Sequence, residues 1–143
     1  MIKLCNTCFY HLRRLRTVKH SLTSASLQTL VHAFVCNRVD YCNSVLYGAS
    51  THVLDRIQSV LNAAARLILG LRKYDHISGA TREILHWLPV RQRINFKISL
   101  LARNCLIGAA PDYLRELFIQ LSATNRHNLR AAKRGDLLIP RYR

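Results

Sequence analysis

The stretch that decides the fold is Thr51–Leu69, which has the sequence THVLDRIQSVLNAAARLIL. Apolar residues recur along it every three or four positions, the spacing of one face of an α-helix, for about five turns. Gly70 follows directly, and glycine commonly ends a helix because it adopts the left-handed conformation without strain. The pattern predicts a helix over residues 51–69, in which the small residues 63–65 let another helix approach closely. Its apolar face carries Leu54, Ile57, Leu61, Ala64 and Ile68, and its polar face carries Asp55, Ser59, Asn62 and Arg66.

The same spacing continues on the amino-terminal side of this helix. It predicts a first helix over residues 2–16. Thr23 can cap a second helix, because its hydroxyl can accept a hydrogen bond from a free amide of the next turn. We expect this second helix to run to about residue 46, with a bend near Asn37, and to stop at Gly48. The predicted apolar stripes are Leu4, Cys8, Leu12 and Leu15 in the first helix and Leu27, Leu30, Phe34, Tyr41 and Val45 in the second.

Shorter helices are predicted on the carboxyl-terminal side. Ser78 can cap one that runs to Leu85, and Pro89 ends it because proline lacks the amide donor and clashes with the preceding turn. A further helix is expected over about residues 90–107, closed by Gly108. Pro111 suits the start of a short helix over residues 112–118. The helix from residue 90 is predicted to bury Ile94, Ile98, Leu101 and Cys105.

These patterns predict an all-α protein. Five or six helices are expected to form a small irregular bundle over residues 1–121, a helical module, followed by a basic and partly disordered tail over residues 122–143. Half of the 143 residues are hydrophobic, which is enough for a real core. Within the tail, the apolar run Leu137–Ile139 is expected to be a short strand or a docking segment.

The charge is strongly positive and uneven. The chain has 22 Lys and Arg against 7 Asp and Glu, a net charge of +15. Positive residues gather in residues 1–20, around Arg91 and in residues 126–143, whereas residues 21–70 are nearly balanced. Clustered charge of this kind favours a polyanion partner, because phosphate contacts release counterions. Nucleic acid is the first candidate; an anionic membrane surface and an inert basic surface are the alternatives.

The cysteines, the first 20 residues and the lengths of the apolar runs indicate in which cellular compartment the protein is expected. Five cysteines at irregular spacing do not make the pattern of a secreted disulfide framework. Residues 1–20 do not resemble a cleavable signal sequence, and no uncharged apolar run reaches about 18 residues, so no membrane span is expected. We therefore expect an intracellular protein, cytoplasmic or nuclear, with reduced thiols.

Catalytic and metal sites are not expected in this chain. Cys5 and Cys8 have the spacing of a zinc-binding pair, but no second pair exists and Cys8 lies on the apolar stripe, so we favour core thiols over zinc. Polymerase chemistry needs two neighbouring carboxylates to hold magnesium. The nearest such pair, Asp112 and Glu116, lies beside Arg115 and is more simply a solvated helix face. The scattered histidines form no nucleophilic triad, so we predict no catalytic residue, no metal and no cofactor.

Binding through basic side chains is the more credible function. Arginine holds phosphate with its planar fork, although pairing with a local acid or with a helix end is the alternative for each cluster. Trp87 could stack on a base, but its neighbours Leu85 and Leu88 favour burial in the core. The candidate nucleic-acid contacts are Arg13, Arg14, Arg16, Arg91, Arg93, Lys97, Arg126, Arg130, Lys133 and Arg134.

Three segments, in this order and spacing, together resemble one known family. They are Leu30–Phe34 leading to Arg38–Ser44, then Gln58–Arg66, then Leu85–Arg93. The set is similar to the region that follows the catalytic core in jockey-like, LINE-type non-LTR retrotransposon reverse transcriptases. The similarity extends from about residue 9 to residue 143.

The resemblance implies a parent polyprotein with an endonuclease and an RNA-directed DNA polymerase of fingers, palm and thumb. It places this chain in the thumb and the region after it, as a truncated copy without the metal-binding aspartates. Asp40 is not one of those aspartates, and we expect it to be structural, accepting hydrogen bonds or pairing with a basic group. Such a segment would grip RNA, DNA or an RNA–DNA hybrid. The alternative is a structural fragment that packs on the missing palm domain and has no activity of its own.

Overall fold

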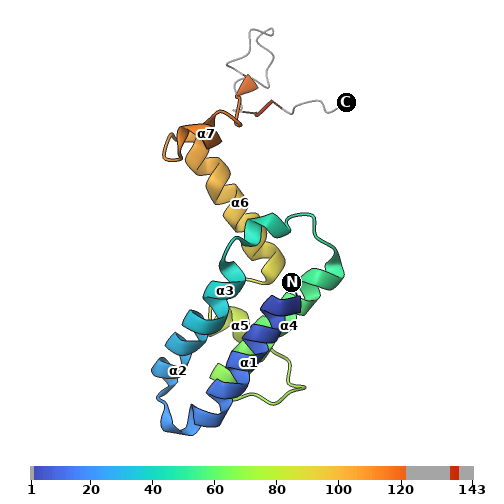
Figure 1. The fold of residues 1–143 in the computed structure, drawn as a ribbon, viewed down its shortest axis with the longest axis vertical. Helices are drawn as coiled ribbons and strands as arrows, with labels where there is room; N and C mark the ends of the chain where they lie inside the picture. Colours follow the sequence, from blue (N-terminus) through green and yellow to red (C-terminus); the bar gives the residue numbers. More distant parts are fainter. Residues whose placement is uncertain (1, 122–135, 139–143) are drawn as a thin grey trace. The chain divides into compact units, whose positions relative to one another are not determined.

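The computed structural model describes residues 2–121 and 136–138, and this part of the chain is all-α, as predicted (Figure 1). The chain divides into two compact units, Met1–Phe96 and Lys97–Arg143. The predicted boundary at residue 121 stays a prediction, because most residues after it lie outside the described part. The helices are α1 (Ile2–Val18), α2 (Ser24–Val31), α3 (Asn37–Asp40), α4 (Thr51–Leu69), α5 (Ser78–Glu83), α6 (Val90–Leu106) and α7 (Asp112–Arg115).

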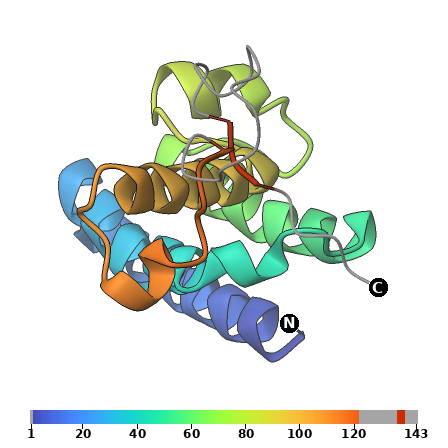
Figure 2. The ribbon, with the colours of Figure 1, turned by 90° about the horizontal axis from the view of Figure 1, so that it is seen from above.

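The core of the first unit lies between α1, α4 and the segment from α2 to α3, which Figure 2 shows from above. Helices α1 and α4 run in the same direction. Ile2 and His52 line one hollow near the starts of the two helices, and Arg16 and Leu67 line another near their ends. The α2–α3 segment runs back along α1, since the His11 ring stacks on Phe34 at 5.1 Å.

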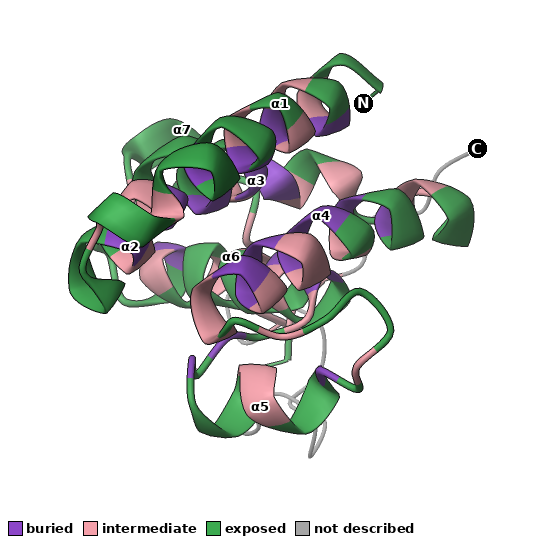
Figure 3. Ribbon diagram, turned by 90° about the horizontal axis from the view of Figure 1, so that it is seen from below, coloured by how far each residue is buried: buried purple, intermediate pink, exposed green. Residues whose placement is uncertain are grey.

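Helix α4 has the predicted bounds, and most of its predicted apolar face is confirmed. Leu54, Ile57, Leu61 and Ala64 are buried, whereas Ile68 is half-buried. In Figure 3 the buried positions of α4 form a stripe along the helix, and α5 carries none. Gly70 ends α4 with a φ of 70°, the left-handed conformation that favours glycine.

The segment from α2 to α3 begins as predicted. The Thr23 hydroxyl accepts a hydrogen bond from the Ser26 amide at 3.2 Å and so caps α2. A π-helical turn, His32–Cys36, then joins α2 to α3. Regular helix ends at Asp40 and not near residue 46, because Cys42 adopts a φ of 52° and a separate 3₁₀ turn, Asn43–Leu46, follows.

The predicted apolar stripe of this segment is largely wrong. Leu27 is buried, but the stripe continues through Val31, Val35 and Val39, four residues apart. The predicted positions Phe34, Tyr41 and Val45 are exposed, and Leu30 is half-buried. Both sets of residues fit a helical period, and the buried set is the one with the β-branched valines.

The linker between α4 and α6 carries the short helix α5. Its N-cap is Ile77, and Ser78 is the first helical residue, so the predicted capping role of Ser78 is wrong. Trp87 is buried, as predicted, with 5% of its surface exposed. Pro89 then precedes α6, and its carbonyl oxygen accepts the Arg93 amide at 2.9 Å, which completes the first turn of α6.

The second unit contains the rest of α6, followed by α7. Cys105 is buried as predicted, but Leu101 is exposed, and α7 is shorter than the predicted helix over residues 112–118. In the run Leu137–Ile139, predicted to be a short strand or a docking segment, Leu137 forms an isolated antiparallel bridge with Gln120, and Ile139 lies outside the described residues. None of the helices in the described ranges is both long and apolar enough to cross a lipid bilayer.

Candidate nucleic-acid interface

The arginine cluster near the end of α1 is exposed to solvent. Helix α1 buries Cys8, Leu12 and Leu15, so the residues between them face outward. Arg13, Arg14 and Arg16 are all exposed. Arg16 lies in the last turn, where a cation also interacts favourably with the negative end of the helix dipole. The α1 cluster therefore presents three permanent charges to water.

Two of these arginines line the same hollow as a lysine from a distant part of the sequence. Arg13, Arg16 and Lys73 line one hollow of about 230 Å³, called here the basic hollow. Arg14 is not part of its lining. Lys73 lies in the turn that follows α4, and the parallel packing of α1 and α4 brings the ends of these helices together. The apolar lining of the basic hollow consists of Phe9, Leu12, Ala63 and Leu67.

A further cation lies close to the basic hollow but is already engaged. The Nζ of Lys19 donates a hydrogen bond to the Leu67 carbonyl oxygen at 2.8 Å, at the carboxyl end of α4. A cation at this position stabilises the helix end and satisfies a carbonyl without a helical partner. Lys19 therefore adds positive potential near the basic hollow while its main contact is structural.

The cations of the basic hollow have no acidic partner in the described residues. Within residues 2–121 and 136–138, ion pairs join Arg93 to Asp40 and Arg115 to Asp112. Neither pair involves Arg13, Arg16 or Lys73. In the described part of the chain, these cations therefore do not pair with local acids, which was the alternative to phosphate binding.

Arg91 lies at a different hollow. It is exposed and lines a hollow of about 350 Å³ together with Tyr47, which follows the 3₁₀ turn, and Thr51, the first residue of α4. Its lining shares no residue with that of the basic hollow. The two basic clusters of the first unit therefore do not line a single hollow.

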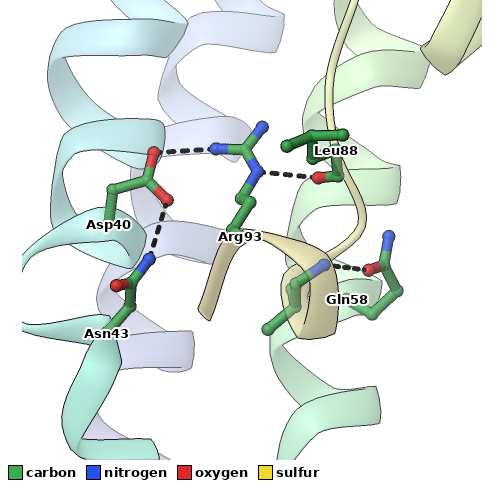
Figure 4. A network of polar contacts seen from close by, with 6 residues as sticks. Asp40, Asn43, Gln58, Leu88 and Arg93 are labelled. Carbon is green, nitrogen blue, oxygen red and sulfur yellow. Dashed lines mark hydrogen bonds and ion pairs between the residues drawn. The ribbon is translucent and has the colours of Figure 1, made fainter. Parts of the chain in front are cut away.

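Arg93 points into the first unit and holds three segments together (Figure 4). Its Nη1 donates to the Asp40 Oδ2 at 2.7 Å, and its Nε donates to the Leu88 carbonyl oxygen at 2.7 Å. The Arg93 side chain is only 14% exposed. Asp40 also accepts from the Asn43 Nδ2 at 3.5 Å, so its expected structural role is confirmed. For Arg93, acid pairing is what the structure shows, and a phosphate would have to displace Asp40.

Trp87 lies next to this arginine. The Arg93 guanidinium carbon lies 5.6 Å from the centre of the Trp87 ring, and the His32 ring meets Trp87 edge-on at 5.4 Å. The predicted burial of Trp87 is confirmed, and a buried ring offers no face on which a base could stack. Its Nε1 is buried and has no hydrogen-bond partner among the described residues.

The remaining candidate contacts lie elsewhere. Lys97 is exposed and is the first residue of the second unit. The four tail candidates, Arg126, Arg130, Lys133 and Arg134, lie outside the described residues. Lys73 is absent from the sequence-based candidates, and the available signal was its place in the polar loop directly after Gly70.

Asp112 and three of the thiols are candidates for a magnesium or zinc site by residue type alone. Asp112 accepts from Arg115 at 2.9 Å on the exposed helix α7. Cys5, Cys8 and Cys36 are buried, and burial raises the pKa of Cys8 and raises the pKa of Cys36 to about 12. Among residues 2–121 and 136–138, no three His, Cys, Asp or Glu side chains are grouped so that they could hold a metal ion.

No protein-family model, curated protein or solved structure matches this chain.

Proposed function

We propose that this chain binds the phosphate backbone of nucleic acid, with little sequence preference, as the segment that follows the polymerase core of a non-LTR retrotransposon reverse transcriptase. The three sequence segments at Leu30–Ser44, Gln58–Arg66 and Leu85–Arg93 support the origin. The observation that carries the binding is the α1 cluster, whose arginines are exposed and have no acidic partner in the described residues. RNA, DNA and RNA–DNA hybrids all offer the phosphates that such a cluster requires.

The physical reason is counterion release. Each phosphate neutralised by an arginine or lysine frees a condensed cation, so affinity falls steeply as salt rises. The net charge of +15 adds long-range attraction and fast association. Arginine suits this task, since its guanidinium keeps its charge and fits two phosphate oxygens at once. Contacts of this kind position a strand without selecting its sequence.

The test is the salt dependence of binding to a short RNA–DNA hybrid. A plot of log affinity against log salt is expected to have a slope of about −0.9 for each phosphate neutralised on a duplex. The triple variant Arg13→Gln, Arg14→Gln, Arg16→Gln should make this slope shallower by up to about 2.7, which is about 0.9 for each of the three arginines. A matched control removes three exposed cations elsewhere, at Arg38, Arg56 and Arg103.

Two results would count against the proposal. A flat plot for the unmodified chain would exclude phosphate binding. Equal loss in the α1 triple variant and in its control would mean that the total charge, and not the α1 cluster, determines affinity. Circular dichroism of both variants checks that they fold, which is expected because every substituted side chain lies outside the buried core.

A second candidate function is docking on the polymerase palm. The observation that favours it is the apolar surface between α3 and α4, where Tyr41 and Val45 are each 81% exposed. Exposed apolar groups of this kind mark interaction surfaces. Sedimentation at high salt would support this function if the chain self-associates and if Val45→Glu restores the monomer. A clean monomer at high salt would disfavour it.

We also propose that the chain has no polymerase activity of its own, because magnesium catalysis needs neighbouring carboxylates. The nearest acidic pair in the sequence, Asp112 and Glu116, lies on an exposed turn where Asp112 already accepts from Arg115. Incorporation of nucleotides by the purified chain on a primed template, lost on replacing Asp112 and Glu116, would contradict this.

A further inference from the structure

We infer that the basic hollow is a site for one nucleotide of a single strand, with its phosphate on Arg13, Arg16 and Lys73 and its base stacked on Tyr74. The inference rests on the proposed function and goes further, because it names a site and prefers a single strand to a duplex. Three features of the first unit carry it: converging cations, an exposed aromatic ring, and the turn that holds the two together.

The convergence of cations is the first feature. Arg13 and Arg16 come from α1, and Lys73 comes from the turn after α4, yet all three line one hollow of about 230 Å³. Like charges brought together repel one another, and no acid of the described residues pairs with them. An anion in the hollow would remove this repulsion. The lining also includes Phe9 and Leu67, so the hollow offers apolar surface beside the charges.

The exposed ring of Tyr74 is the second feature. This side chain is 86% exposed, and the Lys73 Nζ lies 5.3 Å from the centre of its ring. The ring therefore lies beside the ammonium group of Lys73, which lines the basic hollow, and most of the ring is exposed to water. A positive groove next to a free aromatic ring is how proteins hold single strands without reading their sequence. The bases of a duplex are already stacked, so only a single strand can use this ring fully.

The turn that carries Lys73 and Tyr74 is the third feature. The Asp75 amide donates to the Arg72 carbonyl oxygen at 3.3 Å, so Lys73 and Tyr74 occupy the two central positions of the turn. The Asp75 carboxylate accepts the Arg72 amide at 2.7 Å and closes the turn from the side. Arg66 in α4 donates to the Asp75 carbonyl oxygen at 3.2 Å. The two residues are thus held next to the end of α4, and an approaching strand need not order them.

The ring is tested with strands that differ only in their bases. Binding of the full chain to fluorescently labelled ten-nucleotide oligouridine is compared with binding to an abasic strand of the same length, by fluorescence anisotropy. Tyr74→Leu should weaken oligouridine binding about fivefold or more, the usual effect of losing one aromatic stack, and leave the abasic strand nearly unchanged. The matched control is Tyr41→Leu at a similarly exposed tyrosine that no cation of the basic hollow is shown to contact, and this variant should bind both strands like the unmodified chain.

The cations are tested with a second pair of variants that remove one charge each. Lys73→Gln should weaken both strands several-fold, because it removes a phosphate contact. Arg14 neighbours Arg13 in the sequence but does not line the basic hollow. Arg14→Gln should therefore lower the affinity for single strands no more than it lowers the affinity for a duplex. Inorganic phosphate and anionic vesicles serve as competitors. The three competitors are compared at equal total concentrations of phosphate groups. The inference would be overturned if inorganic phosphate or the vesicles displaced the labelled strand at a lower concentration than unlabelled oligouridine does.

The failure of this site and the failure of the proposed function can be told apart. If all strands and duplexes bind with a steep salt dependence but Tyr74→Leu behaves like Tyr41→Leu, the site is wrong and phosphate binding stands. Equal affinity for oligouridine and the abasic strand leads to the same conclusion. If no nucleic acid binds, both are wrong. Thermal unfolding should be unchanged in both tyrosine variants, which shows that a change in binding does not reflect a loss of fold.

Discussion

Removing the carboxylate of Asp40 should destabilise the first unit. Asp40→Ala leaves the Arg93 guanidinium with the Leu88 carbonyl oxygen as its remaining hydrogen-bond acceptor. An exposed ion pair contributes about 0–1 kcal/mol, whereas breaking a buried one costs about 3–5 kcal/mol. The Arg93 side chain is 14% exposed and that of Asp40 is 41% exposed, so water partly screens this pair. We expect a loss of about 1–2 kcal/mol in the free energy of unfolding.

The assay is urea unfolding followed by tryptophan fluorescence. Trp87 is the one tryptophan of the chain, and its ring lies 5.6 Å from the Arg93 guanidinium, so its emission reports on this network. A double-mutant cycle with Asp40→Ala and Arg93→Met isolates the pair, because methionine keeps an apolar stem beside the ring. The coupling energy should be about 1 kcal/mol, with an unchanged dependence on urea.

The exposed pair between Asp112 and Arg115 provides the control. These residues lie three apart on α7 and both remain open to solvent, so their coupling should stay below about 0.5 kcal/mol. If the coupling between Asp40 and Arg93 is no larger than this, the pair does not hold α3 to α6. Far-UV circular dichroism must follow the same transition as the fluorescence for the cycle to be valid.

The remaining predictions concern three other features of the first unit. Trp87→Phe should cost only about 1 kcal/mol, because it keeps an aromatic ring in the core and removes a buried N–H that has no partner among the described residues. Trp87→Ala also removes the ring and should cost about 3–5 kcal/mol. Urea unfolding followed by circular dichroism measures both losses. Gly70→Ala should cost about 1 kcal/mol, because Gly70 has a φ of 70° that alanine adopts only with strain. Gly79→Ala within α5 should stabilise the fold slightly, because the added methyl group meets nothing within 4 Å. The midpoints of thermal unfolding should differ in these opposite directions. Burial raises the pKa of Cys36 to about 12, so above about pH 9 the unfolded thiol loses its proton while the folded thiol keeps it, and stability falls as pH rises. Cys36→Ala should remove about 1 kcal/mol of that loss for each pH unit, seen by comparing urea midpoints at about pH 8 and about pH 10.

The prediction of α4 succeeded because every signal for it is local. Its apolar period runs through Leu54, Ile57 and Leu61, and Gly70 supplies the stop one residue beyond the end. A helix with one apolar face can be oriented in only one way against a core. Thr23 is similar, since a cap needs only its own hydroxyl and an amide of the next turn.

The α2–α3 segment could not be predicted from its period alone. Phe34 and Val35 are neighbours, and each continues a helical stripe that starts at Leu27 or Leu30. Which stripe is buried depends on where α1 and α4 lie, and this is a tertiary property. The π-helical turn His32–Cys36 also shifts the face by about one residue, with no sequence marker such as proline or glycine to announce it.

The candidate interface was predicted in part. Neighbours in the sequence, Arg13 and Arg16, were correctly expected to cluster, because one helix turn separates them. Lys73 joins them only through the parallel packing of α1 and α4, which the sequence does not reveal. Arg91 and Arg93 look equivalent in the sequence, yet they lie on different faces of α6, and Asp40 holds Arg93 inward.

The use of the acidic residues explains how a surface can stay so positive in a folded chain. Asp40 accepts from Arg93, and Asp75 holds the turn of Lys73 and Tyr74. In these two contacts the carboxylates stabilise the backbone or a partly buried charge, and they do not neutralise the α1 cluster. Loss of a structural acid should therefore lower stability, whereas loss of an α1 arginine should lower affinity and relieve charge repulsion. Variants of the two kinds should separate into two groups when stability is plotted against binding, and an α1 variant that loses both would show that the cluster also supports the fold.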